Sequence, residues 1–177
     1  MINRTKEGVY TATGDIVVAR REDIETLKEE ASKAKLKRAR LCWHQSQEDR
    51  IQEMTIAFTK ESYIRPHKHI GKTESAYIIE GIADLVFLNK SGEVEEVREI
   101  GDSSSARSFY YRINQEIYHT LLIKSPYFVM HEVTNGPFVR GDVVFLPNSP
   151  DDKDEVVTGD YIKDLEKRAE MCLRSQR

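Results

Sequence analysis

The sequence of 177 residues predicts a mainly β protein, in which one small antiparallel β-barrel carries a helix before it and a helix after it. Between about residues 51 and 146, short β-branched and aromatic runs alternate with turn residues at short intervals. That pattern is typical of an antiparallel sandwich or barrel. Before and after it, apolar residues recur at helical spacing. The length suits one domain overall.

Residues 1–45 are expected to form a lead-in with a short strand over 15–20 and a helix after it. Glu22 and Asp23 favour the start of that helix, because carboxylates are stabilised at the positive end of the helix dipole. The apolar residues of one helical face are Ile24, Leu27, Ala31 and Ala34. The basic run over 33–40 is interpreted as the solvated end of the same helix, and the alternative is a patch for an anionic ligand.

The barrel is predicted over residues 46–148, and residues 149–177 are predicted to form an acidic linker and a C-terminal helix over 160–173. The expected strands cover 54–59, 74–80, 82–88, 94–100, 109–113, 119–124 and 127–133. Gly81 separates two of these strands, and Asn89–Gly92 forms a turn between two others.

Composition excludes several classes of function. The formal net charge of −3 and the pI of about 6.0 argue against a nucleic-acid partner bound by bulk electrostatics. No run reaches the roughly 18 apolar residues of a membrane span, and no apolar segment follows the polar N-terminus as in a signal peptide. The two cysteines, Cys42 and Cys172, are far apart and predict reduced thiols in a cytoplasmic protein.

Candidate metal ligands cluster between residues 63 and 74. His67 and His69 are two residues apart, so both imidazoles point to the same face of a strand. Glu74 begins the next predicted strand and shares a face with the apolar Ala76 and Ile78. A carboxylate on a core-facing side is unfavourable unless it is paired with a cation. The pattern therefore predicts a site for a divalent metal.

A third imidazole completes a four-ligand set. His119 begins a predicted strand and shares its face with the apolar Leu121, so it can point into the same interior. His44 and His131 fit this role less well. His131 lies on the opposite strand face from its neighbour Glu132, so the two side chains cannot both point inward.

These residues resemble the first motif of the cupin superfamily, whose order and spacing are matched by His67, His69, Glu74 and Gly81. His119 resembles the histidine of the second cupin motif. The resemblance implies a jelly-roll-like β-barrel in which His67, His69, Glu74 and His119 bind one divalent metal ion from the inside. Zinc, iron, manganese and nickel are the candidate metals.

The chain is also similar to the WbuC-type cupin metalloproteins over about residues 20–150. The matching residues are 63–69, Lys72, Glu74, Tyr118–Thr120, Glu132 and Gly136–Pro137, with Arg38–Arg40, His44 and Gln52 upstream. Genes of that family occur among those for bacterial surface-polysaccharide synthesis. The resemblance thus implies a ligand that is a sugar or sugar-nucleotide intermediate of O-antigen or lipopolysaccharide biosynthesis.

The chain departs from the cupin motifs in two turns. Glu61 stands where the first motif usually has glycine, and Asn114 and Glu116 replace the proline and glycine that usually precede the second-motif histidine. Glycine adopts positive φ easily and glutamate does not. We therefore expect the loop before His119 to differ in shape from that of other cupins.

Three imidazoles and one carboxylate leave a coordination position open, as catalytic metal sites do. Glu132 is the candidate catalytic residue, as a general base or a partner of a ligand, and the alternative is a buried carboxylate satisfied by an arginine or tyrosine. The candidate substrate-binding residues are Arg65, His44, Gln52 and Lys72. For Arg65 the alternative is a salt bridge at the rim.

Three functions are consistent with such a site. The first is a metal-dependent enzyme that isomerises or epimerises a sugar or sugar nucleotide. The second is an Fe(II)-dependent dioxygenase, and the third is a non-catalytic module whose metal fixes a small ligand or stabilises the barrel. The strand edges of so small a barrel need cover, so by analogy we expect a homodimer.

Overall fold

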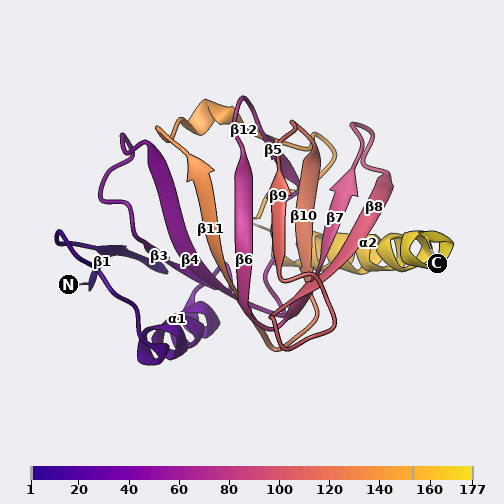
Figure 1. Cartoon of the computed structure of the whole chain (residues 1–177). Coiled ribbons are helices and arrows are strands. Elements are labelled where there is room, and N and C mark those ends of the chain that lie inside the picture. The colour runs from indigo at the N-terminus through magenta and orange to yellow at the C-terminus, as the bar shows by residue number, and fades with distance from the viewer. Residues whose placement is uncertain (1, 153, 177) are drawn as a thin grey trace.

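The computed structural model describes residues 2–152 and 154–176. Two β-sheets face each other, and one helix packs on the outer side of each sheet (Figure 1). This arrangement confirms the mainly β, jelly-roll-like fold that the sequence predicts. Within the described residues, no helix combines the length and the apolar character that crossing a membrane requires.

The larger sheet has seven strands in the order β1-β2-β3-β4-β11-β6-β9. Their bounds are β1 (Ile2–Lys6), β2 (Val9–Ala12), β3 (Arg38–Cys42), β4 (Ile51–Thr59), β6 (Glu74–Glu80), β9 (Tyr110–Ile113) and β11 (Tyr127–Asn135). Neighbouring strands are antiparallel except β2 and β3, which are parallel.

The smaller sheet has five antiparallel strands in the order β12-β5-β10-β7-β8. Their bounds are β5 (His67–His69), β7 (Ile82–Leu88), β8 (Val94–Gly101), β10 (Tyr118–Ile123) and β12 (Val143–Phe145), and a short 3-10 helix, η1 (Arg140–Asp142), precedes β12. A single bridge between Ile100 and Ser108 lies outside these strand pairings.

The interior between the sheets is apolar over most of its depth. Its buried residues are Ile56, Phe58, Ala76, Ile78, Ala83, Leu85, Ile100, Leu121, Ile123, Phe128 and Met130. Phe128 is fully buried and its ring lies 6.4 Å from that of Phe58. These residues alternate with outward-facing neighbours, because successive side chains of a strand point to opposite faces.

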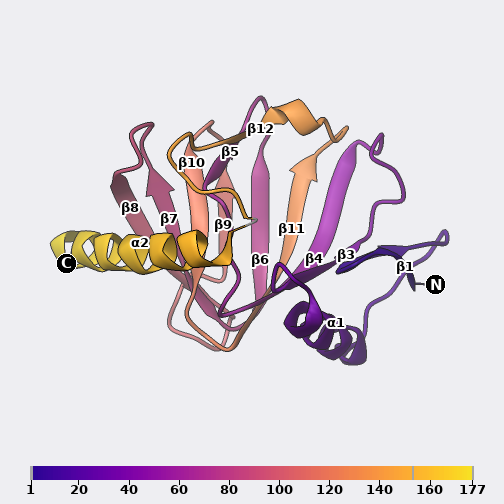
Figure 2. The ribbon, with the colours of Figure 1, turned by 180° about the vertical axis from the view of Figure 1, so that it is seen from behind.

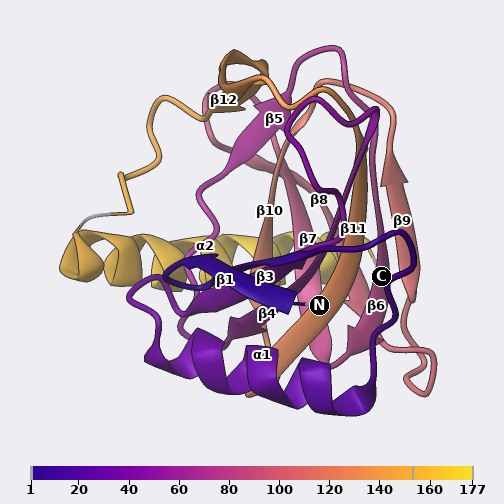
Figure 3. The ribbon, with the colours of Figure 1, turned by 90° about the vertical axis from the view of Figure 1, so that its left-hand side faces the viewer.

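The helix α1 (Arg21–Lys33) covers the outer side of β3, β4 and β11 (Figure 3). The prediction that this helix continues to Arg40 is wrong, since residues 38–42 form β3. Ala39 and Leu41 are buried under α1, while Arg38 and Arg40 alternate with them. The many basic residues of this segment made its two-residue alternation hard to recognise in the sequence. Pairing with β4 makes the segment a strand.

The strand expected over 15–20 is also absent, since those residues precede α1 without regular structure. The chain begins instead with a hairpin of β1 and β2 that turns at Gly8, whose φ is 65°. All residues of β1 are exposed, so no buried alternation marked this strand in the sequence.

The second helix, α2 (Glu155–Gln176), crosses the outer side of the smaller sheet (Figure 2). Its buried residues Leu165 and Ala169 belong to the same apolar cluster as Val86 of β7 and Leu122 of β10. The helix begins earlier and ends later than the span over 160–173 that the apolar spacing predicts.

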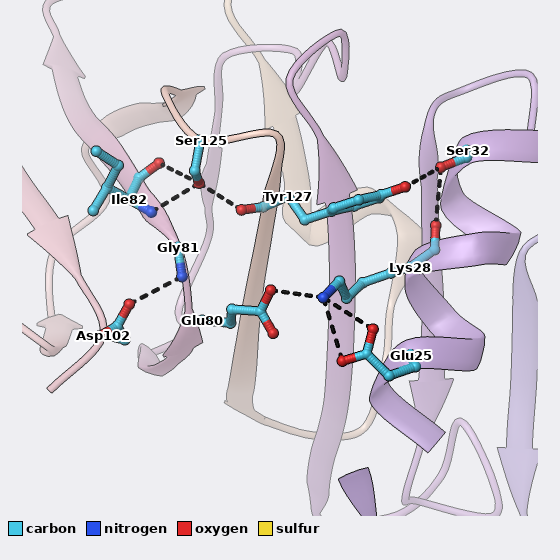
Figure 4. A network of polar contacts seen from close by, with 9 residues as sticks. All are labelled: Glu25, Lys28, Ser32, Glu80, Gly81, Ile82, Asp102, Ser125 and Tyr127. Carbon is cyan, nitrogen blue, oxygen red and sulfur yellow. Dashed lines mark hydrogen bonds and ion pairs between the residues drawn. The ribbon is translucent and has the colours of Figure 1, made fainter. Parts of the chain in front are cut away.

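A network of polar contacts joins α1 to the larger sheet, at the end of the sheet that lies away from β12 (Figure 4). Lys28 Nζ lies 2.7 Å from a carboxylate oxygen of Glu80 and 3.1 Å from one of Glu25. The hydroxyl groups of Ser32 and Tyr127 lie 2.8 Å apart. These contacts hold the lead-in helix to the strands β6 and β11.

Gly81 makes the turn between β6 and β7 in the same region (Figure 4). Its φ is +87°, and a Cβ there would overlap the backbone oxygen of Tyr127 and the hydroxyl of Ser125. The Gly81 N–H donates to Asp102 Oδ2 at 3.2 Å, and the Ile82 N–H donates to Ser125 Oγ at 2.9 Å. The turn between β6 and β7 therefore requires glycine at this position of the first motif.

Candidate metal centre

The four predicted ligands come from both sheets. His67 and His69 are the end residues of β5, and His119 on the adjacent β10 lies directly opposite His67 in the register. Glu74 is the first residue of β6 in the larger sheet. The two-residue period of β5 turns both of its imidazoles inward, and the structure brings all four side chains together.

The ligand atoms converge on one point. One nitrogen or oxygen from each of the four residues lies within 4.8 Å of the other three. Glu74 Oε2 is 3.0 Å from His69 Nε2 and 3.4 Å from His119 Nε2. Ligands at about 2.0–2.2 Å from an ion stand roughly 3–4 Å from one another, so a single ion fits among these atoms after a small adjustment.

Two of the imidazoles are oriented by the backbone. His67 Nδ1 donates to the Arg65 carbonyl at 2.8 Å, and His119 Nδ1 donates to the Ile117 carbonyl at 3.0 Å. In the neutral ring this leaves the Nε2 lone pair free to bind a metal, the usual arrangement for histidine ligands.

The buried His119 Nε2 has no hydrogen-bond partner within the described residues, and its 3.4 Å approach to Glu74 lacks hydrogen-bond geometry. Buried polar atoms rarely remain unpaired. A metal ion bound by Nε2 supplies the missing partner, so the residues present fit a metal.

The electrostatics of the cluster favour a cation. Burial opposes ionisation of Glu74, but the charge of His119 and the close approach of His119 and His69 hold its pKa well below the ordinary value. Burial also opposes protonation of His119, yet Glu74 raises the pKa of this imidazole. Burial and the charge of His119 lower the pKa of His67 to about 3, so His67 is neutral at physiological pH.

Tyr111 is a site residue that the sequence did not indicate. Its hydroxyl donates to Glu74 Oε1 at 2.9 Å. Burial, followed by the charges of Glu74 and Glu132, raises its pKa well above the ordinary value, so the hydroxyl keeps its proton. A signal was present in the predicted strand over 109–113, because two-residue alternation places Tyr111 on the face of the buried Ile113.

Glu132 lies on the inner face of β11. In the register it stands between Met54 of β4 and Ala76 of β6. Burial and then the charge of Glu74 raise the pKa of this carboxyl group, and Arg40 opposes the shift. Glu132 therefore lies on the interior side of the sheet, as the sequence predicts. Its catalytic role stays a prediction.

The opposite orientation of His131 is confirmed. Its Nδ1 lies 3.3 Å from Thr55 Oγ1, and its Nε2 lies 3.8 Å from Glu53 Oε1. Thr55 also accepts a hydrogen bond from the indole of Trp43 at 2.9 Å. His131 therefore belongs to a group of polar side chains away from the metal cluster.

The side chains of Arg65 and Lys72 hold neighbouring segments. The Arg65 guanidinium donates to Ser149 Oγ at 3.0 Å, lies 3.8 Å from a carboxylate oxygen of Asp151 and stacks 4.6 Å from the centre of the Phe145 ring. Lys72 Nζ donates to the carbonyl oxygens of residues 135 and 137 at 3.0 and 2.5 Å. The substrate-binding role of both residues stays a prediction.

Gln52 contacts the backbone of the β3–β4 connection, and His44, which belongs to that connection, contacts the backbone of β4. Gln52 Nε2 donates to the carbonyl oxygens of Ser46, Gln47 and Asp49 at 3.0–3.3 Å. His44 Nδ1 lies 2.9 Å from the carbonyl oxygen of Glu53. These contacts shape the loop over 43–50, and no substrate is needed to account for either side chain.

The altered turn before His119 has a structural partner. Glu116 Oε1 accepts a hydrogen bond from the Gly71 N–H at 3.1 Å, and Glu116 Oε2 lies 3.6 Å from Lys68 Nζ. Among the described residues, Lys37 is the one non-glycine residue with positive φ, so neither Asn114 nor Glu116 is strained in this sense. Glu116 thus ties the loop before β10 to the loop after β5.

The comparisons with known proteins concern the sequence and the fold. The family model that matches the sequence, over residues 19–100, is described as a domain of unknown function (DUF6016). A comparison with curated proteins finds no match.

Among solved structures, protein SO0799 from Shewanella oneidensis is similar over 60% of this chain and 72% of its own, with 9% identity and a TM-score of 0.50. CapF, solved with an inhibitor, shares 17% identity over 60% of this chain and 31% of its own, with a TM-score of 0.48. Oxalate oxidase in complex with the substrate analogue glycolate shares 16% identity over 55% of this chain and 47% of its own, with a TM-score of 0.44. The matched part spans less than half of these last two chains. At such identities the likeness concerns the fold alone, and the chain is a mainly β protein of jelly-roll-like fold whose two sheets bring three histidines and one glutamate together.

Proposed function

We propose that this protein binds one divalent metal ion through His67, His69, Glu74 and His119, and acts on a sugar or sugar-nucleotide intermediate of surface-polysaccharide biosynthesis. The metal part rests on one observation above all. Four ligand atoms from two sheets converge, and one of them, His119 Nε2, is buried without a hydrogen-bond partner.

The protein's own groups define what such a site can do. A bound ion with an open position polarises a carbonyl or hydroxyl oxygen of a ligand. Glu132 stands on the inner face close enough to Glu74 for their charges to interact, so it can accept or donate a proton beside the bound ligand. Tyr111 keeps its hydroxyl proton and orients Glu74.

Titration of the metal-free protein with Zn²⁺ and Mn²⁺ in a calorimeter tests the metal part. We expect one site per chain in the wild type and loss of that site in His69→Ala. His131→Ala is the matched control, since His131 lies on the opposite face of its strand from the inner Glu132 and should leave binding unchanged. Equal binding by wild type and His69→Ala would contradict the proposal.

The carbohydrate part is supported by the residues shared with WbuC-type cupins, among them the stretch over 63–69 and Glu132. A panel of nucleotide sugars should be screened with metal-loaded protein for binding and for isomerised or epimerised product. We expect Glu132→Gln to abolish turnover while one metal still binds. Absence of both binding and turnover across the panel would refute the carbohydrate assignment.

Two other functions follow from the same ligand set. Three imidazoles and one carboxylate also suit Fe(II), so a dioxygenase is the second candidate, and oxygen uptake by reduced iron-loaded protein distinguishes it. Because the ligands come from both sheets, the ion can also serve to fasten them together without catalysis. In that case His67→Ala lowers thermal stability, whereas Glu132→Gln leaves ligand binding intact.

A cytoplasmic homodimer completes the proposal. Cys42 and Cys172 are both free thiols, as expected in a reducing compartment. The exposed aromatic side chains of Tyr77 and Tyr110 on the larger sheet, with the adjacent Phe109, offer apolar area for a second copy. Light scattering at micromolar concentration measures the mass, and a monomeric mass would contradict the dimer.

A further inference from the structure

The two carboxylate oxygens of Glu74 have different surroundings. Oε2 faces the imidazoles, at 3.0 Å from His69 Nε2 and 3.4 Å from His119 Nε2. Oε1 accepts a hydrogen bond from the Tyr111 hydroxyl at 2.9 Å. The side chain of Glu74 is only 5% exposed, so bulk water does not compete for either oxygen.

Tyr111 is well suited to be the donor to Oε1. When Nε2 binds the metal, the Nδ1 atoms of His67 and His119 donate to backbone carbonyls, so neither ring has an N–H left to offer Oε1. Within the part of the chain that the structure describes, the second hydrogen-bond contact of the Tyr111 hydroxyl is Met130 Sδ at 3.9 Å, and a thioether is a weak acceptor. The hydroxyl and Oε1 are therefore matched partners.

The fold holds this pair in register. On the adjacent strands β6 and β9, Glu74 lies opposite Ile113 and Ala76 lies opposite Tyr111. The small Ala76 leaves room for the phenol to reach diagonally to Glu74, and diagonal neighbours lie within reach of aromatic side chains. Tyr111 also lines a cavity of about 260 Å³, together with Leu85 and Phe87.

We propose that Tyr111 is a positioning residue that makes Glu74 a one-oxygen metal ligand. By occupying Oε1, it prevents this atom from joining Oε2 on the ion, and it keeps a coordination position open for a substrate oxygen. This inference rests on the metal site proposed above, because it concerns how one of the four ligands is presented.

The experiment compares Tyr111→Phe with the wild type, using Co²⁺ alone as the probe. Phenylalanine retains the ring that lines the cavity and removes only the donor. Tyr110→Phe is the matched control, because it removes a hydroxyl from the exposed neighbouring residue of the same strand. Circular dichroism and thermal unfolding without metal check that the variants keep the wild-type fold.

We expect Tyr111→Phe to weaken Co²⁺ binding about 10–100-fold, the usual effect of removing a group that orients a ligand. We also expect its visible Co²⁺ spectrum to lose intensity, because a freed carboxylate can bind through both oxygens and raise the coordination number. Tyr110→Phe should match the wild type in both measurements. A wild-type spectrum in Tyr111→Phe overturns the proposal, whatever the affinity.

The two levels of failure are distinguishable. If wild-type protein binds no Co²⁺, the metal site itself is refuted, whereas wild-type binding with an unchanged Tyr111→Phe spectrum refutes only the role of Tyr111. If Tyr111→Phe does not fold, infrared difference spectra of the wild type with and without Co²⁺ decide. A wide separation of the symmetric and asymmetric carboxylate stretches supports one-oxygen binding, and a narrow separation overturns it.

Discussion

Replacing Glu132 by glutamine should stabilise the metal-free protein at alkaline pH. Burial, followed by the charge of Glu74, raises the pKa of Glu132 from 4.5 to about 8. A carboxyl group with a raised pKa binds its proton more tightly in the folded chain. Its contribution to stability is therefore complete below the unfolded pKa and is lost as the pH rises through the folded pKa.

The loss for Glu132 falls between about pH 4.5 and pH 8, and the difference in pKa corresponds to at most ~5 kcal/mol. Solvent partly reaches the residue, so screening reduces this figure, and we expect about half, ~2 kcal/mol. Glutamine has nearly the same shape and no charge, so it removes the unfavourable ionisation while keeping the packing.

Urea unfolding in the presence of a chelator, at about pH 5 and about pH 9, measures this effect. The free energy of unfolding of Glu132→Gln should differ little from that of the wild type at the lower pH, and exceed it by ~2 kcal/mol at the higher pH. Glu95→Gln, which removes an exposed carboxylate from β8, controls for the change in net charge. A gap that does not widen with pH would refute the burial of a carboxylate at this position.

Four further predictions concern the fold and the metal. Gly81→Ala should lower the free energy of unfolding by ~2–4 kcal/mol in urea, because φ is +87° and the Tyr127 backbone oxygen blocks a Cβ; an unchanged midpoint would count against this account of the turn. Phe128→Ala should cost ~3–5 kcal/mol, since the side chain is fully buried, and a loss below ~1 kcal/mol in the same assay would contradict its place in the core. Free Zn²⁺ at about 100 times its Kd should stabilise the wild type by about 2.7 kcal/mol and leave His67→Ala unchanged in thermal unfolding. Metal uptake at about pH 6, below the ordinary histidine pKa, should release a proton, because Glu74 raises the pKa of His119 against the effect of burial and the ring is protonated there without metal; calorimetry in buffers of different ionisation heat would show no buffer dependence if this were wrong.

The barrel strands could be predicted because their burial follows a simple alternation. Strands such as β6 and β7 carry apolar residues that face one interior, and turn residues separate them. The segment over 38–42 escaped prediction because its arginines resemble a helix end, while its strand state depends on pairing with β4, a contact that is not local. The hairpin of β1 and β2 escaped because β1 buries no side chain.

The ligand cluster could be predicted because three of its members lie within eight residues. The spacing of His67, His69 and Glu74 already specifies a shared face and a following strand. Tyr111 could not be assigned in the same way, since its approach to Glu74 depends on β9 pairing with β6 across two intervening strands of the chain. The backbone contacts of Lys72 likewise appear only when β11 is in place.

Elemental analysis of protein purified without a histidine tag tests the central claim most directly. The convergence of His67, His69, Glu74 and His119 predicts one transition-metal ion per chain. It also predicts that His69→Ala, purified in the same way, carries little metal. A wild-type content well below one ion per chain, even after reconstitution with zinc, iron, manganese or nickel, would contradict the account.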